Sequence, residues 1–127
     1  MENKTVMSIE TVIDYIEANL DGKLDLEMVA EAVHYSKYHL HRMFTSTVGM
    51  TIHDYVQRRQ LTEAAKLLVF SDRPIIEVAF ICGYESQQAF SSAFKSMYKI
   101  PPAEYRDNRE FYPLQLRFAL HRNAAKK

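Results

Sequence analysis

Apolar residues recur at helical spacing through residues 36–49, SKYHLHRMFTSTVG, and form one continuous stripe. The members of this stripe are Leu40, Met43, Phe44 and Val48. A second stripe at the same spacing is polar and consists of Tyr38, His41, Arg42 and Thr45. Ser36 is a favourable N-cap, and Gly49 suits the left-handed residue that closes a helix. The pattern predicts a helix with one face for a core. Its other face is either an ordinary solvated surface or a reader of the DNA major groove.

The same pattern occurs a second time, about fifty residues later. A shift of fifty places Ser36 on Ser86 and Phe44 on Phe94, while just upstream a shift of forty-nine places Tyr35 on Tyr84. Glu85 accounts for the extra residue. Because two repeats are too few for a solenoid, we interpret them as two copies of one small module.

The apolar spacing also predicts helices over about 8–20, 26–33, 52–70, 75–82 and 102–106, besides 37–48 and 86–98. The stretch 52–70 contains no Gly or Pro and predicts a rigid rod. The expected fold is therefore all-α. It consists of a first helix-turn-helix subdomain at 1–50, a linker helix at 51–70, a second helix-turn-helix subdomain at 71–110 and a C-terminal tail at 111–127.

The tail has a different period. Leu114, Leu116, Phe118 and Leu120 alternate with other residues, which is the spacing of a strand. Two interpretations stay open: a tail that lies on the helices, or the first strand of a domain outside this sequence.

Composition narrows the class of protein. A hydrophobic content of 47% suffices for a core, and no apolar run approaches the length of a membrane span. The single cysteine, Cys82, and the absence of a signal-peptide pattern favour the cytoplasm. The net charge is zero, yet the charges are nearly all acidic between Glu10 and Glu31, with Lys23 as the exception, and mostly basic between His34 and Leu61. Such a polarised chain is compatible with one nucleic-acid-binding face.

Other functions have weaker support. The histidines do not follow a zinc-binding spacing, and no cofactor is expected. No phosphate loop, nucleophile elbow or carboxylate pair indicates an enzyme. The acidic residues Glu10, Asp14 and Glu17 predict a solvated face of the first helix, with contact to RNA polymerase as the alternative. A helical protein-interaction module without DNA binding is the main rival to the DNA hypothesis.

Four stretches together resemble the AraC/XylS family of bacterial transcription regulators, above all its short members. They are YSKYHLHRMF, GMTIHDYVQRRQLTEAAKLL, IIEVAFICGYESQQAF and FKSMYKIPPAEYR, and the resemblance extends over about residues 8–108. It implies two helix-turn-helix subdomains on a long helix, with residues 37–48 and 86–98 entering successive major grooves of double-stranded DNA. It also implies activation of transcription by a protein that binds as a monomer.

The resemblance assigns roles residue by residue. The expected base contacts are Tyr38, His41, Arg42, Gln87, Gln88, Ser91 and Ser92. The expected phosphate contacts are Lys37, Arg58, Arg59 and Lys95. The chain departs from its close relatives at four of the positions compared. His34 replaces a turn glycine, His41 a glutamine, Tyr38 a tryptophan and Ser92 an arginine, so we expect a strained first turn and a second module that reads bases less strictly.

Overall fold

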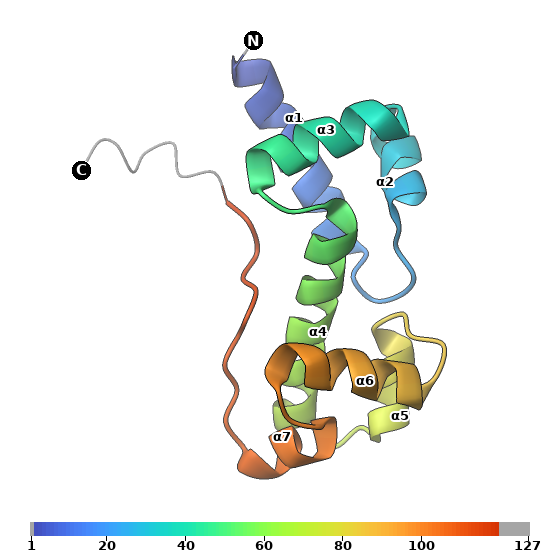
Figure 1. Ribbon diagram of the computed structural model, residues 1–127, viewed down its shortest axis with the longest axis vertical. Helices are drawn as coiled ribbons and strands as arrows, with labels where there is room; N and C mark the ends of the chain where they lie inside the picture. Colours follow the sequence, from blue (N-terminus) through green and yellow to red (C-terminus); the bar gives the residue numbers. More distant parts are fainter. Residues whose placement is uncertain (1, 120–127) are drawn as a thin grey trace, which may run out of the picture.

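The computed structural model describes residues 2–119, with side chains from Ser8 onward, and every regular element within this range is a helix. The helices are α1 (Glu2–Ala18), α2 (Leu26–Val33), α3 (Lys37–Val48), α4 (Ile52–Phe70), α5 (Ile75–Ile81), α6 (Gln87–Tyr98) and α7 (Pro102–Asn108). The pairs α2–α3 and α5–α6 are the two helix-turn-helix units, and α4 joins them (Figure 1). The all-α prediction is confirmed. Residue 1 and the end of the predicted tail, residues 120–127, lie outside the described residues.

Side-chain caps set the start of the main helices. The Oγ of Ser36 accepts a hydrogen bond from the His39 amide at 3.1 Å, and Ser86 accepts one from the Ala89 amide at 3.0 Å. Thr51 caps α4 in the same way. Each cap satisfies an amide that lacks a partner within its helix, so the repeated serines fix the same helix start in both modules.

Two of the boundaries that differ from the sequence prediction are the start of α1 and the end of α5. Helix α1 begins at Glu2 rather than Ser8, since residues 2–7 contain no Gly or Pro that would stop it. Helix α5 ends at Ile81, and the turn that follows runs through Gly83. Neither difference changes the topology.

Helix α4 belongs to both cores. Its first turns pack Ile52, Tyr55 and Val56 into a core with α1, α2 and α3. Its later turns pack Leu61, Ala64, Ala65 and Leu68 into a second core with α5, α6 and α7. In Figure 1 the first group of helices surrounds the upper part of α4 and the second group its lower part. One helix therefore orients both modules.

The C-terminal segment, defined here as residues 110–119, is extended but pairs with no strand among the described residues, so the interpretation as a tail on the helices holds for it. It runs beside α4 from the second module to the first (Figure 1). The hydroxyls of Tyr98 and Tyr105 donate to the Tyr112 carbonyl at 3.1 and 3.4 Å. Phe118 packs against the first core. The segment thereby contacts both modules.

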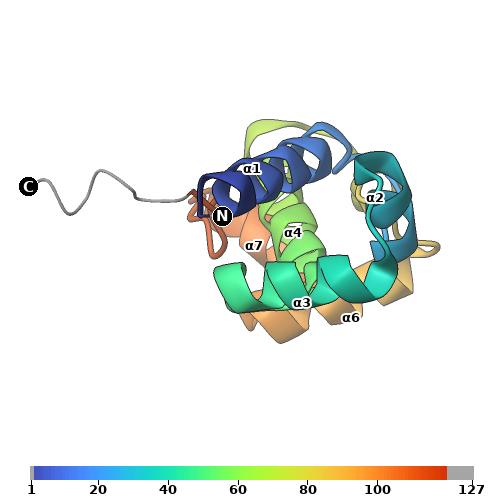
Figure 2. The same cartoon turned by 90° about the horizontal axis from the view of Figure 1, so that it is seen from above.

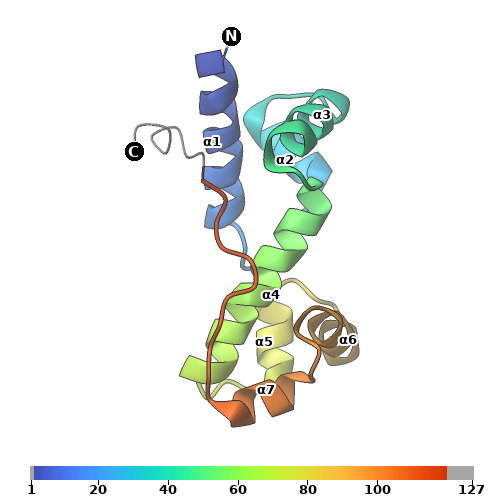
Figure 3. The same cartoon turned by 60° about the vertical axis from the view of Figure 1, so that its left-hand side comes forward.

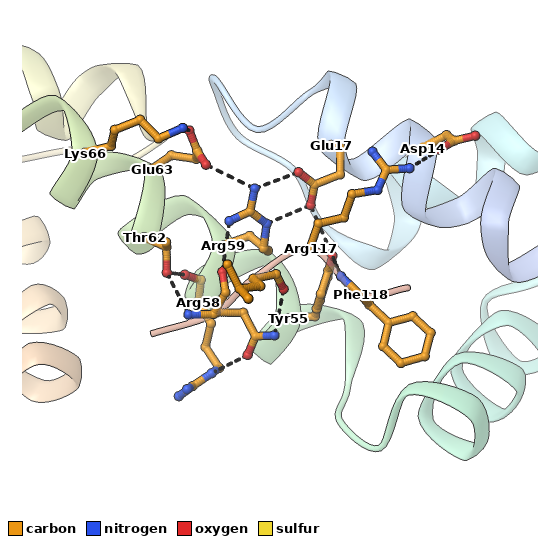
Figure 4. Close-up of polar contacts among 12 residues, drawn as sticks. Asp14, Glu17, Tyr55, Arg58, Arg59, Thr62, Glu63, Lys66, Arg117 and Phe118 are labelled. Carbon is orange, nitrogen blue, oxygen red and sulfur yellow. Dashed lines mark hydrogen bonds and ion pairs between the residues drawn. The ribbon is translucent and has the colours of Figure 1, made fainter. Parts of the chain in front are cut away.

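A buried guanidinium lies where the first module, α4 and this segment meet (Figure 4). Arg59 is 7% exposed, and its Nε and Nη2 donate to the two carboxylate oxygens of Glu17 at 2.8 and 2.7 Å. Its Nη2 also donates to Glu63 at 3.1 Å, and its Nη1 to the Gln115 carbonyl at 3.0 Å. Burial by itself lowers the pKa of Arg59, but the two carboxylates raise it, so the group stays charged. All three nitrogen atoms of the guanidinium therefore donate hydrogen bonds to acceptors within the protein.

Glu17 was predicted to lie on a solvated face of α1, and the structure shows this to be wrong. Its side chain is 13% exposed and also accepts a hydrogen bond from the Tyr55 hydroxyl at 3.1 Å. Helical spacing from Ile13 and Leu20 already sets Glu17 at the edge of the apolar stripe, which was the available signal. Glu17 is therefore the counter-ion of Arg59 on α4.

The modules also touch on the side of the turns. Gly83 has a φ of 87°, and a Cβ added there would lie 2.5 Å from the Gly22 carbonyl oxygen. The Nε2 of Gln60 donates to the same oxygen at 2.7 Å. The loop after α1 is therefore held against the turn between α5 and α6.

Gly83→Ala is expected to destabilise the protein more than Gly49→Ala. Gly49 has a φ of 91° with nothing within 4 Å of an added Cβ, so its substitution carries only the left-handed strain, about 1 kcal/mol. At Gly83 displacement of the Gly22 backbone adds about 1–3 kcal/mol. Urea unfolding of both variants measures the difference, and equal losses of stability would contradict the close approach.

Glu17→Gln is expected to destabilise the protein at neutral pH by about 2–3 kcal/mol, because it leaves a buried cation poorly compensated. Burial raises the pKa of Glu17, but hydrogen bonds and charge from Arg59 and a bond from Tyr55 outweigh it and lower the pKa below 4.5. The carboxylate therefore stabilises the fold above pH 4.5, and this contribution is lost as the pH falls through the lowered pKa. Unfolding curves between pH 7 and 3 should show wild type converging on Glu17→Gln. A gap that stays constant with pH would contradict this.

Candidate nucleic-acid interface

Helix α3 separates its residues into a buried and an exposed face. Leu40 and Phe44 have no exposed surface, and the Phe44 ring meets the Tyr55 ring edge-on at 5.7 Å. Tyr38 is 71% exposed, and three other predicted contacts on this helix are exposed as well: Lys37, His41 and Arg42. The apolar stripe thus anchors the helix, and the predicted contacts are available to a partner.

Tyr38 and Arg42 interact with each other on that exposed face. Arg42 Nη1 donates to the Tyr38 hydroxyl at 3.3 Å, and its Cζ lies 5.4 Å from the centroid of the Tyr38 ring. A guanidinium over an exposed aromatic ring contributes about 0.5–1 kcal/mol. The pair restricts the rotamers of Arg42 before any ligand arrives.

Helix α6 repeats the arrangement in the second module. Phe90 and Phe94 have no exposed surface, and the Phe94 ring stacks on Tyr98 at 4.7 Å. On the outer side the predicted contacts Gln87, Gln88, Ser92 and Lys95 are exposed, and Ser91 is half-buried.

The two helices lie on the same side of the molecule. Figure 2, seen from above, shows α3 and α6 one over the other and running in a similar direction, with α1 on the far side of α4. Figure 3 shows both nearly end-on, to one side of α4. We call the exposed surface of α3 and α6 the recognition face.

The recognition face carries one sign of charge. Helix α3 contains Lys37 and Arg42 and helix α6 contains Lys95, while neither helix contains an aspartate or glutamate. The chain as a whole is neutral. A cationic surface on a neutral chain suits a polyanion such as DNA.

The predicted phosphate contacts are not all brought together. Arg59 is buried on Glu17, so its assignment as a phosphate contact is corrected: the guanidinium cannot leave that carboxylate without exposing a buried charge. Arg58 is half-buried, and its Nε donates to Gln115 at 2.9 Å beside the C-terminal segment. Of the four predicted phosphate contacts, two are exposed on the recognition helices, Lys37 on α3 and Lys95 on α6.

Among the side chains that the structure describes, from Ser8 onward, no group of three or more His, Cys, Asp and Glu residues could hold a metal ion. Within residues 2–119 no helix has the length and hydropathy of a membrane span.

These features define a class of protein: a DNA-binding domain made of two helix-turn-helix units that a shared helix holds in one orientation. The comparison with known proteins agrees. A family model described as a helix-turn-helix domain matches residues 29–108 of this chain.

Relatives and solved structures narrow the class further. The multiple antibiotic resistance protein MarA from Escherichia coli is 40% identical over 104 residues, which cover 82% of this chain and 82% of MarA. The transcriptional activator AarP from Providencia stuartii is 38% identical over 98 residues, 77% of this chain and 73% of AarP. The DNA-binding domain of AdpA, solved in complex with a target DNA, aligns with a TM-score of 0.74 at 27% identity, covering 79% of this chain and 90% of that domain.

The chain belongs to the AraC/XylS family, and it is a DNA-binding transcription regulator. Proteins of this family regulate transcription and are not enzymes. The fold, the cationic recognition face and the comparisons lead to the same assignment.

Arg42→Ala and Arg59→Ala should separate binding from stability. Arg42 is exposed and Tyr38 is its one recorded partner, so its loss should change the free energy of unfolding by about 1 kcal/mol or less. Arg59→Ala leaves Glu17 buried without its counter-ion and should cost about 3–5 kcal/mol. Urea unfolding measures both. Similar losses for the two variants would contradict the division between exposed and buried arginines.

Proposed function

We propose that α3 and α6 enter successive major grooves on one face of a single DNA duplex. The observation that carries this is their common side and similar direction on α4 (Figure 2). A long helix with no glycine or proline keeps them at a fixed separation. Because both helices pack in cores that include α4, the DNA has to present both half-sites on one face.

On α3 the proposed base contacts are Tyr38, His41 and Arg42. Arg42 can donate two parallel hydrogen bonds to O6 and N7 of guanine, the commonest specific contact in the major groove. The ring of Tyr38 holds this guanidinium in place and reduces the entropy lost on binding.

On α6 the proposed base contacts are Gln87, Gln88, Ser91 and Ser92. Gln88 can accept a hydrogen bond from N6 of adenine and donate one to N7, whereas the serines bond to several bases. The second module therefore discriminates less between sequences than the first. Lys37, Arg58 and Lys95 are the proposed phosphate contacts, and Arg58 is the least exposed of them.

One chain carries both readers, so the protein acts as a monomer on DNA. We assign it a role as an activator by analogy with its relatives, among which AarP is described as a transcriptional activator. An activator of this kind works in the cytoplasm and contacts RNA polymerase. On α1 the exposed Asp14 is paired with Arg117, while Glu27 and Glu31 of α2 are exposed.

The rival function is a helical protein-interaction module that does not bind DNA. The recognition face argues against it, because it is polar and cationic and has Tyr38 as its one large exposed aromatic residue. The buried centre of a protein–protein interface is more apolar than the rest of the surface and poor in charged residues.

Selection of DNA from a random-sequence pool tests the proposal. We expect an asymmetric site with two conserved groups about 10 base pairs apart. Arg42→Ala should relax the preference in one group only and weaken binding by about 1–3 kcal/mol, and Gln88→Ala should do the same in the other group. Each variant is the control for the other.

Several outcomes would count against it. Enrichment of a single half-site would refute reading by both modules. A palindromic site bound by two chains would refute the monomer. Absence of any binding at low salt would reject the DNA-binding geometry and leave the protein-interaction module.

A further inference from the structure

Three residues other than glycine have a positive φ in the described part of the chain: His34 at 64°, Lys99 at 74° and Arg109 at 60°. This left-handed region is unfavourable for residues with a Cβ and is most easily adopted by glycine. The predicted strain at His34 is therefore present. Each of these residues closes a helix, and each carries a basic or imidazole side chain.

Comparison of the two modules indicates that a glycine could close α6 at the position of Lys99. Lys99 closes α6 as Gly49 closes α3, and the two amides donate to the carbonyls of Lys95 at 2.7 Å and Thr45 at 3.0 Å. Gly49 has a φ of 91°, in the same region as Lys99. A lysine stands in the second module where the backbone itself favours glycine, so its side chain must have a use that outweighs the strain.

The position of Lys99 suggests that use. It follows Tyr98, the last residue of α6, and lies four residues after Lys95. It is exposed, and its ammonium forms no ion pair with a described carboxylate. Helix α6 has Lys95 as its one cation, and Lys99 adds a second positive charge directly beyond the C-terminal end of the helix.

We propose that Lys99 binds a DNA phosphate at the C-terminal end of α6 and that the strained backbone is retained for this contact. The inference rests on the proposed insertion of α6 into the major groove. Attraction to the partial negative charge at the end of α6 is the competing explanation, since any cation there gains from it. That explanation predicts a loss of stability, and no loss of DNA binding, when Lys99 is removed.

Lys99→Gly distinguishes the two. We expect the urea midpoint of Lys99→Gly to rise, because the strain is relieved. Its affinity for the duplex selected above should fall about fivefold to tenfold near 0.15 M salt, and the slope of log K against log salt should shrink by about 0.9, which corresponds to one phosphate contact. Lys99→Arg, which keeps the charge, should retain both affinity and slope.

Arg109→Gly is the matched control. It removes the same charge and the same left-handed strain, but Arg109 ends α7 where the chain enters the C-terminal segment, on a different flank of α4 from α3 and α6 (Figure 3). It should gain stability like Lys99→Gly without a change in salt slope.

The results distinguish failure of the Lys99 contact from failure of the proposed function. If wild type binds the selected duplex and Lys99→Gly keeps the same affinity and slope, the contact is refuted while the proposed function stands. An equal loss of slope in Arg109→Gly would also refute it, because the effect would then come from net charge. If wild type selects no duplex, the proposed function fails and this inference fails with it.

Discussion

A positive charge buried between two small cores is the constraint on which the arrangement of this protein depends. Removal of Arg59 from water is costly unless its guanidinium is fully hydrogen-bonded and neutralised. Glu17 of α1, Glu63 of α4 and a carbonyl of the C-terminal segment together meet that demand. Satisfying one side chain therefore fixes the angle of α1 on α4 and the path of the segment beside it.

The recognition face depends on this arrangement although no residue of the buried network lies on it. Helices α3 and α6 are each held by aromatic anchors in separate cores, and α4 relates the two cores. The contact of Gly83 with Gly22 and the C-terminal segment add connections on other sides of α4. The distance between the readers is consequently a property of the whole fold and not of the linker helix alone.

Local sequence signals predicted the helices and the exposed residues of α3 and α6 well. Caps such as Ser36 and Ser86 act within three residues, and apolar stripes repeat within one or two turns, so both can be read directly along the chain. The misassignments of Glu17 and Arg59 have the opposite cause. These partners are 42 residues apart, and a charge that faces solvent has the same sequence spacing as one that faces a distant counter-ion. The outward-directed role of Arg59 came from family resemblance, which does not report burial.

Because α4 is part of both cores, it also affects the order in which the helices unfold. If the outer helices of one module open, α4 is still packed in the core of the other module, so α4 loses its structure only when both cores are lost. Its central amides should therefore be the last to exchange with solvent. Proteases that digest opened chains would remove the outer helices long before the rod, so the lifetime of such a regulator in a cell is set by its less stable module.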